Sequence, residues 1–394
     1  MMMRRPIRAL AALFASSLVQ QGCVRFVHAS AAAQPSLASR IRGAFMGAVV
    51  GDALCLGSHY EYDANKILAA YGGKPIEKYM APGEHMGGMT HGVGWGQRNY
   101  HPGKTAGEQT DYGDYNALVL EYFATRKYKD NDPPLPINKS ELISFWQRKM
   151  ETWVGWKCTQ TRQTLQQIQQ GVPQDQLGGM SNAMAIRHAA AFAVYSDEKA
   201  LIDASTTVMF THRNSHAFLA GPYLSRVVHR LLYKNMGLRE AIESAMNDQG
   251  TDEFIRSKVK MALSKVDEAA DPSKPLSQEK MVDDLALTSM ARLWDVGKSE
   301  PIKVGKASPT EGTLPGAIYF ILKYQQLLPA LQANAMVGGD NASRSIAVGM
   351  VLGAYEGVEA IPESYRTSLK HWQRYSDWLD QMPLLKKGSG KDEL

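Results

Sequence analysis

The stretch GGDNASRS, residues 338–345, leads directly into the apolar segment IAVGMVLGAY, residues 346–355. Its two glycines allow a tight turn and a close approach of the backbone to a ligand. Asp340 then stands where an acidic side chain caps the first free N–H groups of a helix. The sequence therefore predicts a helix whose N-terminus carries its own carboxylate.

An earlier stretch, GEQTDYGDY at residues 107–115, is built in the same way and precedes a helix-like run at residues 116–124. Two helix starts that offer carboxylate and hydroxyl oxygens across a cleft would suit a hard cation such as Mg²⁺. Ordinary N-capping is the alternative explanation of each stretch taken alone. Whether Asp111 and Asp340 meet in space decides between the two interpretations.

Helical periodicity recurs through the chain, which has 394 residues and is 44% hydrophobic, enough to bury a core. From Arg40, apolar residues at three- and four-residue spacing are interleaved with Gly43, Gly47 and Gly51, which predicts close helix packing or ligand contact. No run alternates apolar and polar residues over more than a few positions, so strands are not expected. We therefore predict an all-α fold in a single domain.

Further helices are predicted mainly from the periodicity of apolar residues. Ser140 is expected to cap one of them, and Pro222 is expected in the first turn of another. The glycine-rich residues 82–107 lead into Thr110 and predict a flexible lid over the cleft. The predicted helices cover residues 140–153, 160–170, 184–193, 200–210, 222–232, 285–293, 315–328 and 345–355.

Both ends of the chain carry features of targeting segments. Three arginines precede a short apolar segment at residues 9–19, and small residues follow at 29–33, which is typical of a secretory signal peptide over residues 1–33. An acid-free leader also suits an organelle transit peptide, but the final residues 391–394 read KDEL, the retrieval address of the endoplasmic reticulum lumen. We expect a lumenal protein that binds the KDEL receptor, with a helical domain at residues 39–380 and a flexible tail at 381–394.

The composition of the mature chain excludes two classes of partner. Removing the leader takes away four arginines and lowers the formal charge from +5 to +1, so the basic balance does not argue for nucleic acid. No apolar run after the leader reaches the roughly eighteen residues of a membrane span. Cys55 and Cys158 remain, either as one disulfide or as separate buried thiols. Of two sequons, Asn138 is expected to carry a surface glycan, and Asn341, in the proposed cleft, is expected to stay unmodified.

Four blocks of sequence, in this order, resemble the ADP-ribosylglycohydrolase family. They are GAFMGAVVGDAL at residues 43–54, Thr110 with Asp111, SNAM at residues 181–184 followed by Thr211 and His212, and GGD at residues 338–340. Each block is weak alone, and the ordered set is specific. The resemblance covers roughly residues 39–361 and implies an orthogonal all-α bundle that hydrolyses an ADP-ribosyl N- or O-glycosidic bond.

The resemblance also implies a metal site. Members of the family hold two Mg²⁺ ions between a Thr-Asp-Asp helix start and an Asp-x-Asp-(Thr/Ser) start, and the ions position ADP-ribose and polarise the bond at its anomeric carbon. At these positions Thr110, Asp111, Asp340 and Ser343 match and are the expected ligands of one or two ions. Asp111 and Asp340 are accordingly expected to be catalytic.

Two positions depart from the pattern of the family. Tyr112 stands in place of the second Asp of the first motif, and Ala342 in place of the second Asp of the last motif. Their loss would lower the negative charge of the metal cage, since Mg²⁺ is held by carboxylates and water. Asp114, three residues after Asp111, is expected to compensate in part as a further ligand.

Four other residues complete the expected site. Glu61 stands where some members keep an acidic residue near the scissile bond, and it is expected to orient or deprotonate water. Ser181, Asn182 and His212 match a block whose residues contact the ribose or phosphates in relatives, and are expected to bind substrate. A surface carboxylate is the alternative for Glu61, and a core or capping histidine is the alternative for His212.

The sequence leaves more than one function open. The spelling of the two motifs is similar to the branch that contains selenoprotein J and the J-type lens crystallins of jellyfish, where the fold can serve a structural purpose. One interpretation is a Mg²⁺-dependent hydrolase acting on an ADP-ribose-like molecule or an ADP-ribosylated protein. A second is a catalytically inactive, crystallin-like or ADP-ribose-binding protein. A third, a glycosidase using paired carboxylates alone, requires a fixed distance between two acids.

Overall fold

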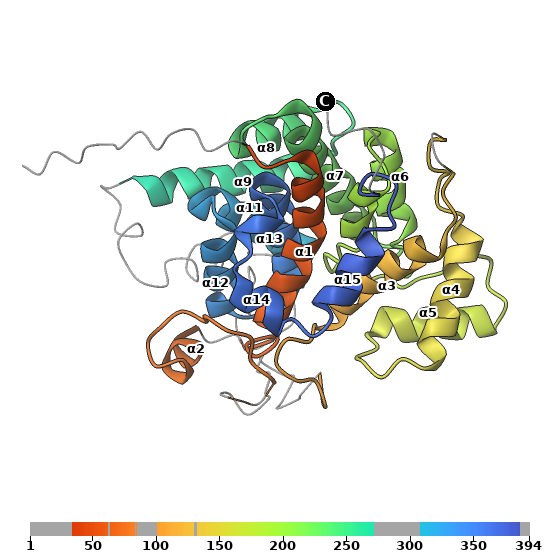
Figure 1. Ribbon diagram of the computed structural model, residues 1–394, viewed down its shortest axis with the longest axis horizontal. Coiled ribbons are helices and arrows are strands. Elements are labelled where there is room, and N and C mark those ends of the chain that lie inside the picture. The colour runs from red at the N-terminus through yellow and green to blue at the C-terminus, as the bar shows by residue number, and fades with distance from the viewer. Residues whose placement is uncertain are drawn as a thin grey trace, which may run out of the picture. The chain divides into compact units, whose positions relative to one another are not determined.

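The computed structural model describes residues 34–61, 64–82, 84, 101–129, 132–271 and 308–386. The described residues from Pro35 onward belong to one compact unit. The described helices are α1 (Leu37–Cys55), α2 (Ala64–Ala70), α3 (Asp111–Thr125), α4 (Lys139–Glu151), α5 (Thr159–Gln169), η1 (Ala189–Ala193), α6 (Glu198–Thr207), α7 (Ser215–Lys234), α8 (Leu238–Asn247), α9 (Glu253–Ala270), α11 (Thr310–Tyr324), α12 (Leu327–Val337), α13 (Asn341–Glu356), η4 (Val358–Ala360), α14 (Glu363–Ser368) and α15 (Trp372–Leu379) (Figure 1).

The all-α prediction is confirmed. Within the described ranges there is no β-strand, and the extended pairing is limited to isolated bridges such as Gly179 with His212 and Ala183 with Pro309. None of the helices in this part of the chain is long and apolar enough to cross a membrane.

The centre of the fold is the antiparallel pair of α1 and α13, which lie side by side in Figure 1. Their backbones touch at glycines. A Cβ placed on Gly47 would lie 2.3 Å from the carbonyl oxygen of Gly349, and one placed on Gly43 would lie 2.1 Å from that of Gly353. The glycines of the predicted first helix therefore serve close helix packing, one of the two purposes that the sequence indicated.

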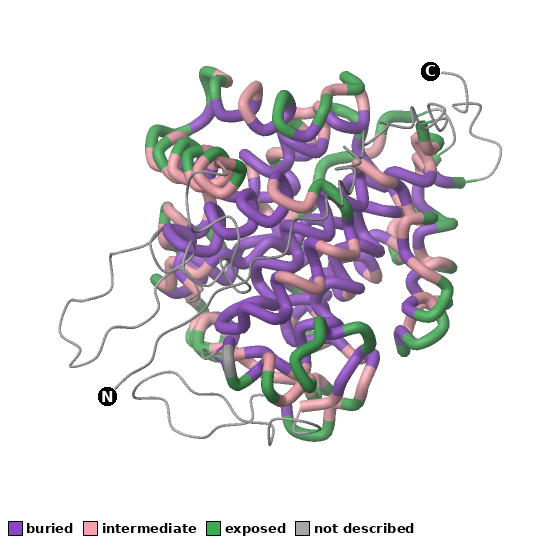
Figure 2. Tube along the Cα trace, turned by 90° about the vertical axis from the view of Figure 1, so that its left-hand side faces the viewer, coloured by how far each residue is buried: buried purple, intermediate pink, exposed green. Residues whose placement is uncertain are grey.

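The antiparallel arrangement decides where the functional residues meet. Because Gly43 faces Gly353 and Gly51 approaches Ser345, the C-terminal end of α1 lies beside the N-terminal end of α13. Almost every residue of both helices is buried, and Figure 2 shows buried positions running through the interior of the unit. The polar groups at these two helix ends are consequently placed inside the protein.

Local capping explains where the two key helices begin. The side chain of Thr110 accepts a hydrogen bond from the N–H of Tyr112 at the start of α3. Asp340 accepts one from the N–H of Ser343 at the start of α13. Both starts were predicted, since a hydroxyl or carboxylate at the N-cap satisfies a backbone donor that has no partner within the helix.

Several predicted boundaries were wrong. Asn138, and not Ser140, caps α4, because its side chain accepts from both Ser140 N and Glu141 N. The helix predicted at residues 184–193 is extended chain followed by the short η1. Pro222 lies inside α7 instead of its first turn, and the segment predicted at residues 315–328 contains the end of α11 and the start of α12. The cap of α4 was thus set by a local residue two positions earlier than predicted.

Some predictions fall on residues outside the described part. These are the leader at residues 1–33, most of the proposed lid at 83–100, the helix at 285–293, and the end of the tail at 387–394. The two described cysteines are separate free thiols, so the disulfide alternative is wrong.

Candidate functional site

The site is built on the end of α1. Asp52, which is fully buried, accepts hydrogen bonds from the backbone N–H of Thr110 at 2.7 Å and from its hydroxyl at 2.6 Å. Burial raises the pKa of Asp52 to about 7, and the hydrogen bonds from Thr110 oppose that shift. Thr110 is thereby held as the anchor of α3. Its hydroxyl donates a hydrogen bond to Asp52 and accepts one from the N–H of Tyr112.

A direct contact joins the starts of α3 and α13. The phenol of Tyr112 donates a hydrogen bond of 2.8 Å to Oδ2 of Asp340. The other carboxylate oxygen of Asp340 accepts from Ser343 N at 3.3 Å and lies 4.0 Å from Nδ1 of His59. The two acid-bearing helix starts therefore meet in space, as the sequence predicted.

Asp111 precedes Tyr112 and shares this buried region. Burial raises the pKa of the Asp111 carboxyl well above its ordinary value, and the neighbouring carboxylates of Asp340 and Asp52 raise it further, while Arg187 opposes the shift. The described residues offer no hydrogen bond to the Asp111 carboxylate. A buried acid with so little compensation favours a bound cation or a retained proton.

Glu61 is placed beside Asp340 by its backbone. Gly339 N donates to the Glu61 carbonyl at 2.6 Å, and Tyr60 N donates to the Gly339 carbonyl at 2.7 Å. Gly338 has φ +75°, and a Cβ there would lie 2.0 Å from the Glu61 carbonyl oxygen. The glycine pair thus permits a close approach to the backbone of Glu61, whereas the sequence predicted an approach to a ligand. Glu61 is only 4% exposed, so the interpretation as a surface carboxylate is wrong.

The extended residues 180–187 bring the predicted substrate-binding residues to the same region. Ser343 donates its hydroxyl hydrogen to the carbonyl of Met184, which ties this segment to the start of α13. The hydroxyl of Ser181 accepts from Ala183 N at 3.2 Å. The amide group of Asn182 donates to both oxygens of Glu311, at 3.3 and 3.2 Å.

Glu311 is a residue that sequence reasoning missed. It is 8% exposed and also pairs with Nδ1 of His216 at 3.0 Å, while the His216 ring stacks on Phe254 at 3.8 Å between centroids. A carboxylate only accepts, so the side-chain NH₂ of Asn182 must face Glu311. The side-chain oxygen Oδ1 of Asn182 is then available to another donor. The signal in the sequence was only an acid in the first turn of α11.

His212 is buried beneath the site. Its Nδ1 lies 3.0 Å from the hydroxyl of Thr211, which also accepts from Arg187 at 2.7 Å. Burial, and then the Arg187 charge, lower the pKa of His212 well below its ordinary value, so the ring is neutral at pH 7. The guanidinium of Arg187 lies 4.3 Å from the centre of the Tyr115 ring. His212 therefore occupies a satisfied internal position.

Asp114 is turned to another partner. Its carboxylate forms an ion pair of 2.7 Å with Lys104 and lines a groove of about 380 Å³ with His371, Arg374 and Trp378. Burial raises its pKa to about 6 against the effect of Lys104. The structure thus gathers Thr110, Asp111, Asp340 and Ser343, and places Asp114 in the wall of that groove.

The carboxylates at the two helix starts can be compared with the ligands that Mg²⁺ requires. In the part of the chain that the structure describes, no group of three or more His, Cys, Asp or Glu side chains is placed to hold a metal. Asp111 and Asp340 remain, and Mg²⁺ is commonly held by one or two carboxylates with water and substrate phosphates. The insufficiently compensated charge of Asp111 supports such an ion. The residues present therefore fit one Mg²⁺ and do not supply carboxylates for two.

Asn341 contributes to the framework below the site. It is fully buried, and its amide donates to Ser58 Oγ at 2.8 Å and to the Ala335 carbonyl at 3.2 Å, while its carbonyl oxygen pairs with Nδ1 of His59 at 3.2 Å. A glycan has no room on this nitrogen. Asn138, by contrast, is exposed.

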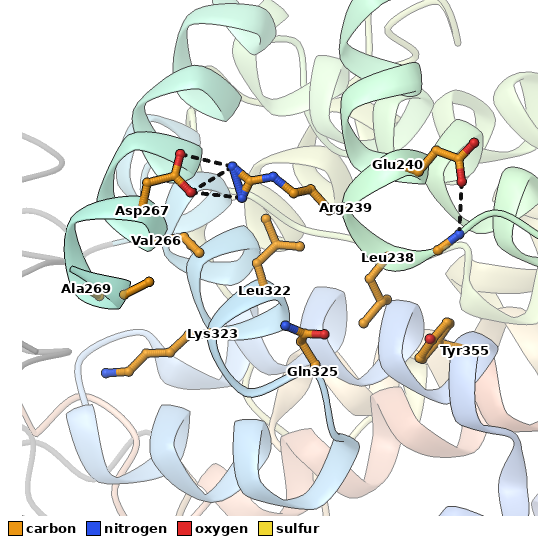
Figure 3. Close-up of a pocket in the computed structure, with 12 residues that line it drawn as sticks. Leu238, Arg239, Glu240, Val266, Asp267, Ala269, Leu322, Lys323, Gln325 and Tyr355 are labelled. Carbon is orange, nitrogen blue, oxygen red and sulfur yellow. Dashed lines mark hydrogen bonds and ion pairs between the residues drawn. The ribbon is translucent and has the colours of Figure 1, made fainter. Parts of the chain in front are cut away.

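A separate cavity of about 590 Å³ lies between α8, α9 and α11 (Figure 3). Two polar contacts in its wall are internal: Arg239 donates to both oxygens of Asp267, and the N–H of Gly237 donates to Glu240. Tyr355 also lines it, fifteen residues after Asp340 along α13, which corresponds to about 22 Å along a helix. This cavity is therefore distinct from the carboxylate site.

Comparisons with known proteins agree with this architecture. Residues 33–392 match the family described as ADP-ribosylglycohydrolase. A solved structure described as an ADP-ribosylglycohydrolase-related protein complex has a TM-score of 0.56 and 18% sequence identity over 89% of this chain and 99% of that chain. At this identity the likeness shows the fold alone. A comparison with curated protein sequences gave no match.

Proposed function

Because the chain belongs to the ADP-ribosylglycohydrolase family, we propose that it hydrolyses an ADP-ribosyl N- or O-glycosidic bond with the help of one Mg²⁺ ion. The observation that carries this proposal is the meeting of the two helix starts, joined by the bond of 2.8 Å from Tyr112 to Asp340. It supports a site that contains Asp111 and Asp340, and the backbone bonds between Glu61 and Gly339 support the addition of Glu61.

Each residue has a distinct part in the proposed reaction. Asp111 and Asp340 would hold the ion, which when bound supplies a positive charge that polarises the glycosidic bond. Glu61, fixed to Gly339 through its backbone, would orient water and accept its proton at the carboxylate. Asn182 would accept a hydrogen bond from a ribose hydroxyl or the adenine amino group, because Glu311 occupies its NH₂.

The test uses peptides that carry N- or O-linked ADP-ribose. We expect hydrolysis that EDTA abolishes and that Asp340→Ala lowers at least about tenfold, or about 1.4 kcal/mol of transition-state stabilisation. Asp377→Ala is the control, since Asp377 is an exposed residue of α15. Unchanged turnover in the Asp340 variant would remove that carboxylate from the mechanism.

A second candidate is a protein that binds ADP-ribose without hydrolysing it, as expected for a branch close to the J-type crystallins. The supporting observation is that Tyr112 and Ala342 replace carboxylates, and that Ala342 is fully buried in α13. Calorimetry separates the candidates, because binding of ADP-ribose together with zero turnover on both peptide types would favour the non-catalytic one.

We also propose that the protein works in the lumen of the endoplasmic reticulum, on the strength of the leader and the KDEL end. This location predicts a glycan on Asn138, which is exposed. Asn138→Asp should remove the glycan and keep the cap of α4, because Asp is an equally good N-cap. Mass spectrometry of the protein from secretory cells would contradict the proposal if Asn138 carried no glycan.

A further inference from the structure

Tyr112 connects the two helix starts, since it lies in the first turn of α3 and bonds to the cap of α13. It is 9% exposed, and its ring meets the ring of His59 edge-on at 6.2 Å between centroids. Its hydroxyl reaches Oδ2 of Asp340 at 2.8 Å. An unperturbed phenol is neutral at pH 7, so the Tyr112 hydroxyl is a hydrogen-bond donor to this carboxylate.

Both oxygens of Asp340 are therefore engaged. Oδ1 accepts the N–H of Ser343 as the cap of α13, and Oδ2 accepts the phenol hydrogen. A cation and an O–H hydrogen that approach the same carboxylate oxygen repel each other. A divalent ion that takes both oxygens of Asp340 would have to displace the phenol.

The residues that follow Asp340 in the first turn of α13 supply no further carboxylate to this site. Arg344, one turn further along α13, is fully buried and donates to Asn334 Oδ1 at 2.8 Å and to the Gly338 carbonyl at 2.6 Å. Its guanidinium is therefore held beside the turn that precedes Asp340. Ala342, on the same first turn, offers only a buried methyl group.

We propose that the hydroxyl of Tyr112 holds Asp340 in place and competes with a divalent cation for Oδ2 of this carboxylate. This inference rests on the proposed function only in taking Asp111 and Asp340 as the metal-binding pair. It makes Tyr112 a residue that sets the affinity of the site for a divalent cation.

The test is calorimetric titration of the full chain with Mn²⁺, which avoids any need for turnover. The wild type should bind one ion per chain. Tyr112→Phe should also bind one ion, at least about fivefold more tightly, because Oδ2 of Asp340 loses its competing donor. Tyr223→Phe is the matched control: it removes a buried phenol that donates to the Ile242 carbonyl, and the affinity should not change.

Three results would overturn the proposal: no gain in affinity for Tyr112→Phe, no binding to either protein, or an equal gain in the control. Thermal unfolding gives a second readout, since Mn²⁺ should raise the melting temperature of Tyr112→Phe more than that of the wild type. Tighter binding by the variant with no hydrolysis of any ADP-ribosyl peptide would leave this inference standing and reject the hydrolase.

Discussion

The carboxylate of Asp52 accepts both hydrogen bonds that Thr110 can donate, from its backbone and from its hydroxyl. Through this contact the end of α1 fixes the start of α3, and through the glycine contacts the same helix supports α13. A single buried helix therefore aligns Asp111 with Asp340. The predictions that follow test this arrangement.

The first prediction concerns pH. The pKa of Asp52 is raised to about 7 in the folded protein from the ordinary value of 3.8, so the folded state keeps a proton that the unfolded chain loses. The stability from this proton is fully present below about pH 4 and is lost as the pH rises through 7. Asp52→Asn is permanently neutral and has the same shape. It should gain stability relative to the wild type over this window, by about 1 kcal/mol per pH unit.

Urea unfolding in EDTA at pH 4.5, 5.5 and 7 measures this difference. Parallel pH profiles for the wild type and Asp52→Asn would show that the carboxyl is not shifted as stated.

The second prediction concerns the contact between α1 and α13. Gly47→Ala places a methyl group 2.3 Å from the carbonyl oxygen of Gly349, which the two backbones cannot accommodate without separating. Overpacking of this kind costs about 1–3 kcal/mol or more of unfolding free energy. Gly237→Ser is the control, because a Cβ at Gly237 meets nothing within 4 Å and the hydroxyl can cap α8. Equal midpoints of urea unfolding for the two variants would contradict the close contact.

The third prediction concerns Glu311 as a positioning residue. Glu311→Gln keeps the size of the side chain but replaces one of its two acceptor oxygens by an NH₂ group. The variant therefore cannot accept hydrogen bonds from both Asn182 and His216 in the way that Glu311 does. We expect the Kd for ADP-ribose to rise about fivefold to tenfold, or about 1–1.4 kcal/mol, with little change in kcat. Glu253→Gln, an exposed substitution on α9, is the control. A fall in kcat at constant Kd would instead give Glu311 a part in the chemical step.

The features that the sequence predicted correctly depend on residues that are close together in the chain. The caps Thr110 and Asp340 and the glycines of α1 carry their signals within a few residues, so the two helix starts and the all-α fold followed from them. The bond between Tyr112 and Asp340 joins residues 228 positions apart, and the contact of Asn182 with Glu311 joins residues 129 apart. Neither has a local signal. The prediction for Asp114 failed in another way. Its spacing from Asp111 suggested a metal ligand, but in the structure its carboxylate forms an ion pair with Lys104.

The separation of α1 and α13 in the chain also has a consequence for synthesis. Gly47 and Gly349 lie roughly three hundred residues apart, so the first apolar helix emerges from the ribosome long before its partner exists. Until then the face of α1 that α13 covers has no partner, and such exposed apolar surface favours aggregation of the nascent chain. A chain that ended before α13 would leave α1 without its main partner.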